Sequence, residues 1–257
     1  MTTTYISTLE AHNSPDRDWH LQGLVKKMEQ CLLQLHRTGF DYTCRDKKKS
    51  GAKPIQQQLG FTLSNSSVRT HNQSGFVVDG DTVVYHNIPE LRAKHLAVNK
   101  KHPREKSVHG NAEQRQLQLR LWSLAMQFIG VTRGELREWA WHDVNMQFSL
   151  MTDCEAHRVG THVDGDDISH QYGIAFGDFD SGPLMVNGTP YEYKNRLLKF
   201  DGRIEHSVPA WSGNYRCNLF FYKHYDRRWT KPDPLLAAPS YVLDLEQGPA
   251  RKRQRVN

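Results

Sequence analysis

The sequence predicts an α+β protein in which helices precede a closed or sandwiched β-structure. Two patterns indicate this. In the first half of the chain, apolar residues recur three and four positions apart, which is typical of helices that pack on a core. From Val144 onward, short apolar runs are separated by Gly, Asp, Pro and Asn, as in proteins built from many short strands.

Two helices are expected. The first spans about residues 15–38, because Ser14-Pro15 supplies a capping residue and a proline at the first helical position, and Gly39 follows the last apolar residue. Its apolar positions are Leu21, Leu24, Val25, Met28, Cys31, Leu32 and Leu35. The second helix is expected at about 112–129, ending at Gly130, and its apolar positions are Leu117, Leu121, Leu124 and Phe128.

Strands are expected in two stretches. Between residues 60 and 85, apolar triplets alternate with Asn, Ser, Gly and Asp, and these triplets are residues 61–63, 76–78 and 83–85. After Val144 the apolar runs are residues 148–150, 173–176, 184–186, 197–200 and 218–222. Polar, basic loops are expected at residues 43–57, which include three consecutive lysines, and at residues 99–106.

The chain therefore divides into three expected parts. Residues 1–57 supply a helix and a basic loop that pack on the core, and residues 58–228 form the β-rich domain. Residues 229–257 are proline-rich and then basic, which predicts an extended, partly disordered tail rather than core. A length of 257 residues accommodates one sizeable core of this kind.

Composition argues against several classes of protein. No apolar stretch approaches the roughly 18 residues of a membrane span, and the N-terminus lacks a secretory signal, so an intracellular location is expected. The four cysteines form no CxxC pair, which argues against a disulfide framework or a zinc knuckle. Four basic residues lie in the last seven positions, and without them the net charge falls from +6 to +2. Bulk charge is therefore weak support for a polyanionic partner.

Three residues in the β-rich part form a candidate metal site. His162 and Asp164 are two positions apart, so on a strand they would point to the same face. His206, at the start of a later strand, would supply the third ligand. Two histidines and one carboxylate occupy one face of an octahedral iron(II) and leave three positions open for a keto acid and O2. The alternatives are a hydrogen-bonded His-Asp pair at a strand edge and a histidine in a turn.

Ten positions after His206, Arg216 precedes the apolar run of residues 219–222. A guanidinium buried on a strand near the metal is costly unless it pairs with a carboxylate, and its planar fork suits the distal carboxylate of 2-oxoglutarate. The spacing therefore indicates this cosubstrate. The alternative is an ordinary surface arginine.

At these residues the sequence resembles the TET/JBP family of 2-oxoglutarate and iron(II) dioxygenases, which oxidise the methyl group of pyrimidine bases in nucleic acids. The motifs that carry the resemblance are His162-Val163-Asp164, residues 172–179 (Tyr-Gly-Ile-Ala-Phe-Gly-Asp-Phe), the turn at residues 181–184, Phe200-Asp201-Gly202 before His206, and residues 213–218 around Arg216. It covers roughly residues 144–225, with a vaguer match over residues 58–143. Where the family has a small hydroxyl residue after the arginine, this sequence has Cys217-Asn218.

The resemblance implies a double-stranded β-helix, or jelly-roll, core that is buttressed by the N-terminal helices. It also implies that His162, Asp164 and His206 hold iron(II). Arg216 and Asn218 would bind 2-oxoglutarate, and O2 would be the second cosubstrate.

The substrate that the resemblance implies is a pyrimidine base, 5-methylcytosine or thymine, in DNA. Such a base must leave the stack to be oxidised, and Asp167, His170 and Tyr172 are candidates to contact it. The two basic loops would hold phosphates. Residues 251–255 (Arg-Lys-Arg-Gln-Arg) are typical of a nuclear-import signal. Two other functions stay open: an oxygenase of a protein side chain or small molecule, and a catalytically silent jelly roll that binds nucleic acid.

Overall fold

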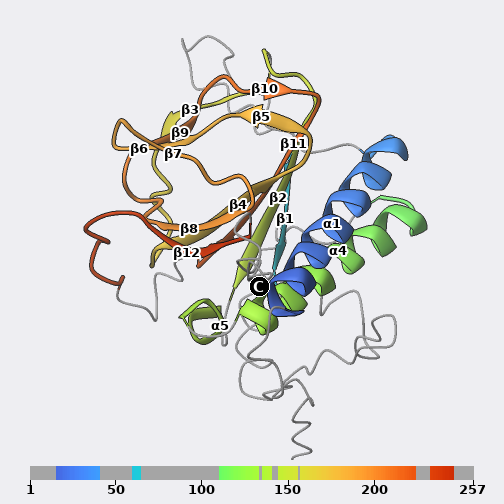
Figure 1. Cartoon of the computed structure of the whole chain (residues 1–257), viewed down its shortest axis with the longest axis horizontal. Coiled ribbons are helices and arrows are strands. Elements are labelled where there is room, and N and C mark those ends of the chain that lie inside the picture. Colours follow the sequence, from blue (N-terminus) through green and yellow to red (C-terminus); the bar gives the residue numbers. More distant parts are fainter. Residues whose placement is uncertain are drawn as a thin grey trace, which may run out of the picture.

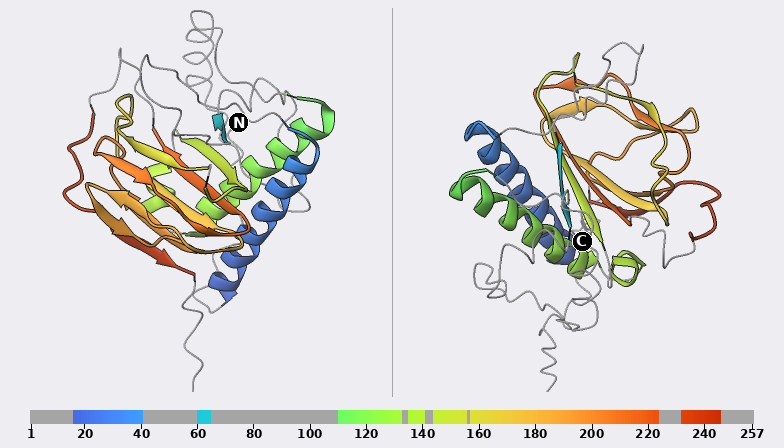
Figure 2. Two further views of the ribbon diagram at one scale, coloured as in Figure 1. Left: turned by 90° about the horizontal axis from the view of Figure 1, so that it is seen from above. Right: turned by 180° about the vertical axis from the view of Figure 1, so that it is seen from behind.

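In the computed structural model, the described residues form a larger and a smaller antiparallel sheet, a two-stranded ribbon and two long helices, which cover the outer side of the larger sheet (Figure 1). The structure describes residues 16–40, 60–64, 110–132, 135–140, 144–155, 157–223 and 232–245. Figure 2 shows the same arrangement from above and from behind, with α1 (Asp16–Arg37) and α4 (Ala112–Thr132) lying side by side. A short helix, α5 (Glu135–Ala140), follows α4.

The order of the strands is that of a double-stranded β-helix. The larger sheet contains, in spatial order, β1 (Gly60–Ser64), β2 (Asn145–Met151), β11 (Arg216–Tyr222), β4 (Gln171–Phe176), β8 (Arg196–Phe200) and β12 (Ser240–Asp244). The smaller sheet contains β3 (Val159–His162), β9 (His206–Val208), β6 (Leu184–Val186) and β7 (Thr189–Tyr191). A short ribbon pairs β5 (Phe179–Ser181) with β10 (Ser212–Gly213). From β2 to β11 the chain passes back and forth between the two sheets, so the predicted jelly-roll core is confirmed.

Two hydrophobic clusters hold these layers together. The outer cluster joins α1 and α4 to one face of the larger sheet, and the inner cluster fills the space between the two sheets. Strand β4 shows how one strand serves both clusters, because Tyr172, Ile174 and Phe176 point to the outer cluster whereas Ala175 points inward. All six residues of β4 are buried, as expected for a strand covered on both faces.

The predicted first helix is confirmed as α1. Its seven predicted apolar residues are at most 5% exposed, which agrees with a stripe that faces a core. The predicted second helix is also present, but the prediction that Gly130 ends it is wrong, because α4 continues to Thr132. A glycine inside a helix costs only about 1 kcal/mol. Burial of Ile129 and Thr132 on either side of Gly130 outweighs that cost.

The C-terminal part of the chain was expected to be a tail, and for residues 240–245 this expectation is wrong. Strand β12 pairs with β8 at the edge of the larger sheet, and Leu245 is 2% exposed in the outer cluster. The backbone carbonyl of Leu245 accepts a hydrogen bond from the Gln22 side chain of α1. The pairing of β12 with β8 and the burial of Leu245 depend on residues far away in the sequence. The proline-rich composition of this segment does not predict such contacts.

The strand predicted at residues 61–63 lies within β1, and the five runs predicted after Val144 lie in β2, β4, β6, β8 and β11. The runs at 76–78 and 83–85, the basic loops and the residues from 246 onward lie outside the described residues. Within the described ranges, no helix is both long enough and apolar enough to cross a lipid bilayer.

Two glycines around α1 lead to a prediction about stability. A Cβ added to Gly23 or to Gly39 would meet nothing within 4 Å, but Gly39 has φ +68° whereas Gly23 lies inside the helix. We therefore expect Gly23→Ala to raise the free energy of unfolding by roughly 0.5–1 kcal/mol. Gly39→Ala should lower it by about 1 kcal/mol, since a side chain is strained at positive φ. Urea unfolding of both variants measures the two signs, and equal signs would contradict the assigned end of α1.

Candidate metal and cosubstrate site

The two candidate histidine ligands face each other across paired strands. His162 is the last residue of β3 and His206 is the first residue of β9, and the antiparallel register places them directly opposite one another. Side chains at directly opposed positions share one face of a sheet, so the two imidazoles lie side by side. Their ring centroids are 4.2 Å apart with an interplanar angle of 49°.

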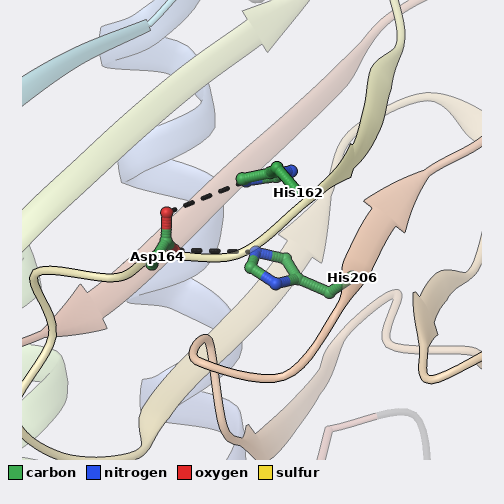
Figure 3. A group of neighbouring side chains, drawn as sticks. All are labelled: His162, Asp164 and His206. Carbon is green, nitrogen blue, oxygen red and sulfur yellow. Dashed lines mark ion pairs between the residues drawn. The ribbon is translucent and has the colours of Figure 1, made fainter.

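Asp164 completes the group from beyond the end of β3 (Figure 3). The expectation that it shares a strand with His162 is therefore wrong. Its backbone amide instead donates a 2.7 Å hydrogen bond to the carbonyl of Gly202, in the loop before β9. Its carboxylate lies beside both rings, with Oδ1 3.8 Å from His162 Nε2 and Oδ2 3.6 Å from His206 Nε2. One potential ligand atom from each of the three residues lies within 4.8 Å of the others.

Both imidazoles are held with the same nitrogen free. Nδ1 of His162 donates to the carbonyl of Gly160 at 2.8 Å, and Nδ1 of His206 donates to the carbonyl of Ile204 at 2.9 Å. This assignment follows from the hydrogen bonds, because a carbonyl can only accept. Nε2 of each ring then carries a lone pair that points toward Asp164. Burial, and then the neighbouring His162, lower the pKa of His206, so the neutral form that a metal needs is favoured.

The loop between β8 and β9 is fixed by a buried ion pair. Asp201 is 1% exposed and accepts hydrogen bonds from Arg203 Nε at 2.8 Å, from Arg203 Nη2 at 2.7 Å and from the backbone amide of Leu236 at 2.9 Å. Burial alone would raise the pKa of Asp201, but these hydrogen bonds outweigh it and hold the pKa below its usual range. The ion pair between Asp201 and Arg203 therefore fixes the loop that contains Gly202 and leads to His206.

Asp167 lies behind the triad. It is 4% exposed, and its carboxylate accepts a 2.5 Å hydrogen bond from Gln171 Nε2, which also donates to Asp164 Oδ2 at 2.7 Å. Burial and the charge of Asp164 raise the pKa of Asp167 to about 7, although the hydrogen bond from Gln171 opposes this shift. Oδ2 of Asp167 therefore belongs to the hydrogen-bond network around Asp164, and contact of Asp167 with substrate stays a prediction.

His170 and Tyr172 lie on the far side of β4. Tyr172 is 0% exposed in the outer cluster, where its ring meets Trp139 at 5.0 Å between centroids. His170 Nε2 lies 3.1 Å from the Tyr172 hydroxyl, and burial lowers the pKa of His170 to about 4. Successive residues of a strand point to opposite faces, so the interior position goes to Gln171 and not to Tyr172. The expected contact of Tyr172 with substrate is therefore wrong.

Arg216 begins β11 and is 0% exposed inside the barrel. Its Nε donates to Asn218 Oδ1 at 3.0 Å and its Nη2 donates to the Tyr193 hydroxyl at 2.6 Å. The guanidinium carbon lies 5.2 Å from the centroid of the Phe179 ring and 5.1 Å from that of Tyr193. Asn218 is in turn fixed by Ser149 of β2, whose hydroxyl accepts from Asn218 Nδ2 at 2.9 Å.

The positive charge of Arg216 has no counterion within the described part of the chain. Nη1 of this arginine is buried without a hydrogen-bond partner, and no carboxylate of the described residues forms an ion pair with it. Burial raises the pKa of Tyr193, so this hydroxyl does not neutralise the charge. A Cβ at Gly182 would lie 2.4 Å from Nη1, so only a glycine leaves that nitrogen its space. The donor set fits a carboxylate that arrives from solution.

A series of ring contacts connects the triad with Arg216. The ring of His206 lies 5.6 Å from that of Phe200, which lies 5.9 Å from that of Phe220. Phe220 lies 6.1 Å from Tyr193, the partner of Arg216. The candidate metal site and the guanidinium of Arg216 are therefore connected through aromatic rings of the barrel interior.

Two residues of this site, Gln171 and Tyr193, were not predicted from the sequence. Gln171 is a polar residue at the start of an apolar run, which is the signal that could have identified it. Tyr193 carries no comparable signal, because it lies between strands and meets Arg216 only through the fold. Gly182 belongs to the turn at residues 181–184 that carries part of the resemblance, but its contact with Arg216 was not predicted.

No family model matches the chain, and no curated protein matches it. Several solved structures do. The dioxygenase for auxin oxidation 1 from Arabidopsis thaliana, in complex with 2-oxoglutarate, is 10% identical with a TM-score of 0.37 and 82% of each chain covered. An oxidoreductase of the 2OG-Fe(II) oxygenase family from Burkholderia pseudomallei is 16% identical with a TM-score of 0.31, covering 79% of this chain and 94% of that one. NgTET1 in complex with 5mC DNA is 15% identical with a TM-score of 0.30, covering 80% and 93%. These identities are low, so the functional assignment rests on the side chains described above.

The triad geometry predicts a strong site for a divalent metal. We expect His206→Ala to weaken Co(II) binding by more than about 100-fold, because it removes a ligand rather than one of the outer partners whose loss typically costs 10–100-fold. Titration of the metal-free protein, followed by Co(II) absorption, measures this. His170→Gln is the matched control, since this half-buried histidine lies on the side of the larger sheet away from the triad and its loss should leave the affinity unchanged. Equal losses in both variants would contradict the assignment.

Proposed function

We propose that this protein is an iron(II) and 2-oxoglutarate-dependent dioxygenase. The observation that carries the proposal is the fully buried Arg216, in the same barrel interior as the His162, Asp164 and His206 triad. Among the residues that the structure describes, its Nη1 has no hydrogen-bond partner. A buried charge without a counterion is costly, so its presence favours a bound anion as part of the working protein. Two histidines and one carboxylate with open positions are the ligand set of non-haem iron(II) oxygenases.

Each residue has a defined part in this proposal. His162, Asp164 and His206 would hold the metal, and Arg216 would pair with the distal carboxylate of 2-oxoglutarate, supported by Asn218. Iron(II) with bound 2-oxoglutarate and O2 supplies the oxidation of an unactivated C–H bond, coupled to decarboxylation of the keto acid. The protein would position these partners and exclude water, for which the aromatic rings between the triad and Arg216 are suited.

For the substrate we propose the methyl group of a pyrimidine base in DNA, 5-methylcytosine or thymine. The support is the resemblance in sequence to the TET/JBP family over the motifs around His162, His206 and Arg216. Three basic segments of the sequence, at residues 47–49, 99–106 and 251–255, would contact phosphates or, for the last, direct the protein to the nucleus. A base within a duplex would have to be flipped out to reach the triad.

One observation favours a second candidate, an oxygenase of a protein side chain or small molecule. The exposed side chains next to the ligands include two acids, Asp166 and Glu205. Negative charges beside the site repel phosphates and suit a neutral or cationic substrate. Product analysis therefore decides between the two candidates.

The unpaired guanidinium leads to two effects of opposite sign. Arg216→Met should raise the thermal stability of the protein without ligands, because an apolar side chain replaces a buried unpaired charge. The same variant should lose the stabilisation that 2-oxoglutarate with Mn(II) gives the wild type, with affinity falling by roughly 10–100-fold for a lost charge-assisted pair. Thermal melts with and without 2-oxoglutarate measure both effects. Arg196→Met, which alters a partly exposed arginine paired with Asp244, is the control.

Turnover assays test the function and the substrate together. Purified protein with iron(II), 2-oxoglutarate and ascorbate should release succinate, and methylated DNA should increase that release. Mass spectrometry of the nucleosides should show an oxidised pyrimidine that is absent with His206→Ala. Turnover that is indifferent to DNA but raised by a peptide or small molecule would favour the second candidate. Absence of any 2-oxoglutarate turnover by the metal-loaded wild type would contradict the proposed function.

A further inference from the structure

A glutamine behind the triad bridges two carboxylates. Gln171 is the first residue of β4 and is 4% exposed on the interior face of the sheet. Its Nε2 lies 2.7 Å from Oδ2 of Asp164 and 2.5 Å from Oδ2 of Asp167. The mechanism proposed above uses neither Gln171 nor these contacts.

Chemistry fixes which end of the Gln171 amide makes these contacts. An ionised carboxylate oxygen only accepts, so the amide nitrogen, which has two N–H groups, belongs between the two acids. Both N–H groups are then used, one on Asp164 and one on Asp167. Oδ2 of Asp164 is thereby engaged, whereas Oδ1, 3.8 Å from His162 Nε2, receives no hydrogen bond from Gln171.

Gly202 provides the space for this arrangement. A Cβ at Gly202 would lie 2.1 Å from Nε2 of Gln171 and 3.2 Å from Oδ2 of Asp164. The φ angle of Gly202 is not in the left-handed region, so the need for glycine here is one of space and not of backbone conformation. The Gly202 carbonyl also accepts the hydrogen bond from the Asp164 amide. Gly202 therefore holds the backbone of Asp164 and leaves room for Gln171, which binds the Asp164 carboxylate.

We propose that Gln171 is a positioning residue that holds Asp164 as a ligand through a single oxygen, Oδ1. This inference rests on the proposed metal site. Oδ2, which lies 3.6 Å from His206 Nε2, is the oxygen that Gln171 occupies, and this hydrogen bond keeps the carboxylate from turning to present both oxygens. Oδ1, 3.8 Å from His162 Nε2, is left for the metal. Coordination through one oxygen leaves one more position on the metal for other ligands than coordination through two. Gln171 therefore protects the open positions that an oxygenase requires.

The experiment is a Co(II) titration of the metal-free, full-length protein, with affinity and the ligand-field absorption spectrum as readouts. Gln171→Leu removes both hydrogen bonds at similar volume and should raise the Kd by about 10–100-fold, as is typical when an outer partner of a metal ligand is lost. The spectrum should shift as well, because Asp164 becomes free to bind through both oxygens. Gly202→Ala should act in the same direction through its Cβ, and Gln171→Asn, which keeps the amide, should lie closer to the wild type.

A matched control separates positioning from loss of fold. Gln118 is another buried glutamine, 1% exposed, whose amide donates to the backbone carbonyl of Gln114 in α4. Gln118→Leu should leave the Kd and the spectrum as in the wild type, and urea unfolding of the metal-free variants reports any common loss of stability. If Gln171→Leu does not fold, Gly202→Ala and Gln171→Asn carry the test.

The outcomes distinguish this inference from the proposed function. Folded Gln171 and Gly202 variants with the affinity and spectrum of the wild type would overturn the positioning role while leaving the metal site intact. If His206→Ala binds Co(II) as tightly as the wild type, the metal site itself is overturned.

Discussion

Burial of one arginine charge is the constraint on which the interior depends. Desolvation of a guanidinium costs several kcal/mol unless its donors are satisfied, and Arg216 is 0% exposed. Its neighbours satisfy the donors only in part, because Asn218 and the neutral Tyr193 accept two hydrogen bonds while no described residue accepts one from Nη1. Residues from β2, β11 and the segment before β8 converge on this charge, so the barrel is polar where a folding core alone would be apolar.

Strand order and strand faces explain why much of this could be predicted from the sequence. His162 and His206 lie on neighbouring strands of the jelly roll. They contact each other because the register pairs these two residues directly. Period-2 alternation likewise assigns Arg216 and Asn218 to the interior of β11, because Cys217 and Leu219 take the outer face. Helix α1 follows from its apolar spacing alone, since one broad face meets the sheet.

The features that the sequence analysis predicted wrongly have one cause in common. Contacts between residues far apart in the sequence determine them. Asp164 lies beyond the end of β3, where its backbone amide donates a hydrogen bond to the carbonyl of Gly202 in the loop before β9. Tyr172 points outward because Gln171, its neighbour on the strand, points inward to the two carboxylates. All residues of β4 are buried, so the sequence pattern does not show which of them point inward. Residues 240–245 join the larger sheet because β8 has a free edge there. A local pattern carries no information on any of these partners.

The three ligands are consequently held in two different ways. The histidines inherit their places from paired strands, and each Nδ1 is fixed by a carbonyl two residues earlier in its own segment. The aspartate stands outside regular structure and depends on side chains and loops from elsewhere: Gly202 for its backbone and Gln171 for its carboxylate. A ligand on a loop has more freedom to change its coordination than one on a strand. The position of the carboxylate is therefore where this site has most need of outside support, and the bridge to Gln171 supplies it at the atom nearest His206.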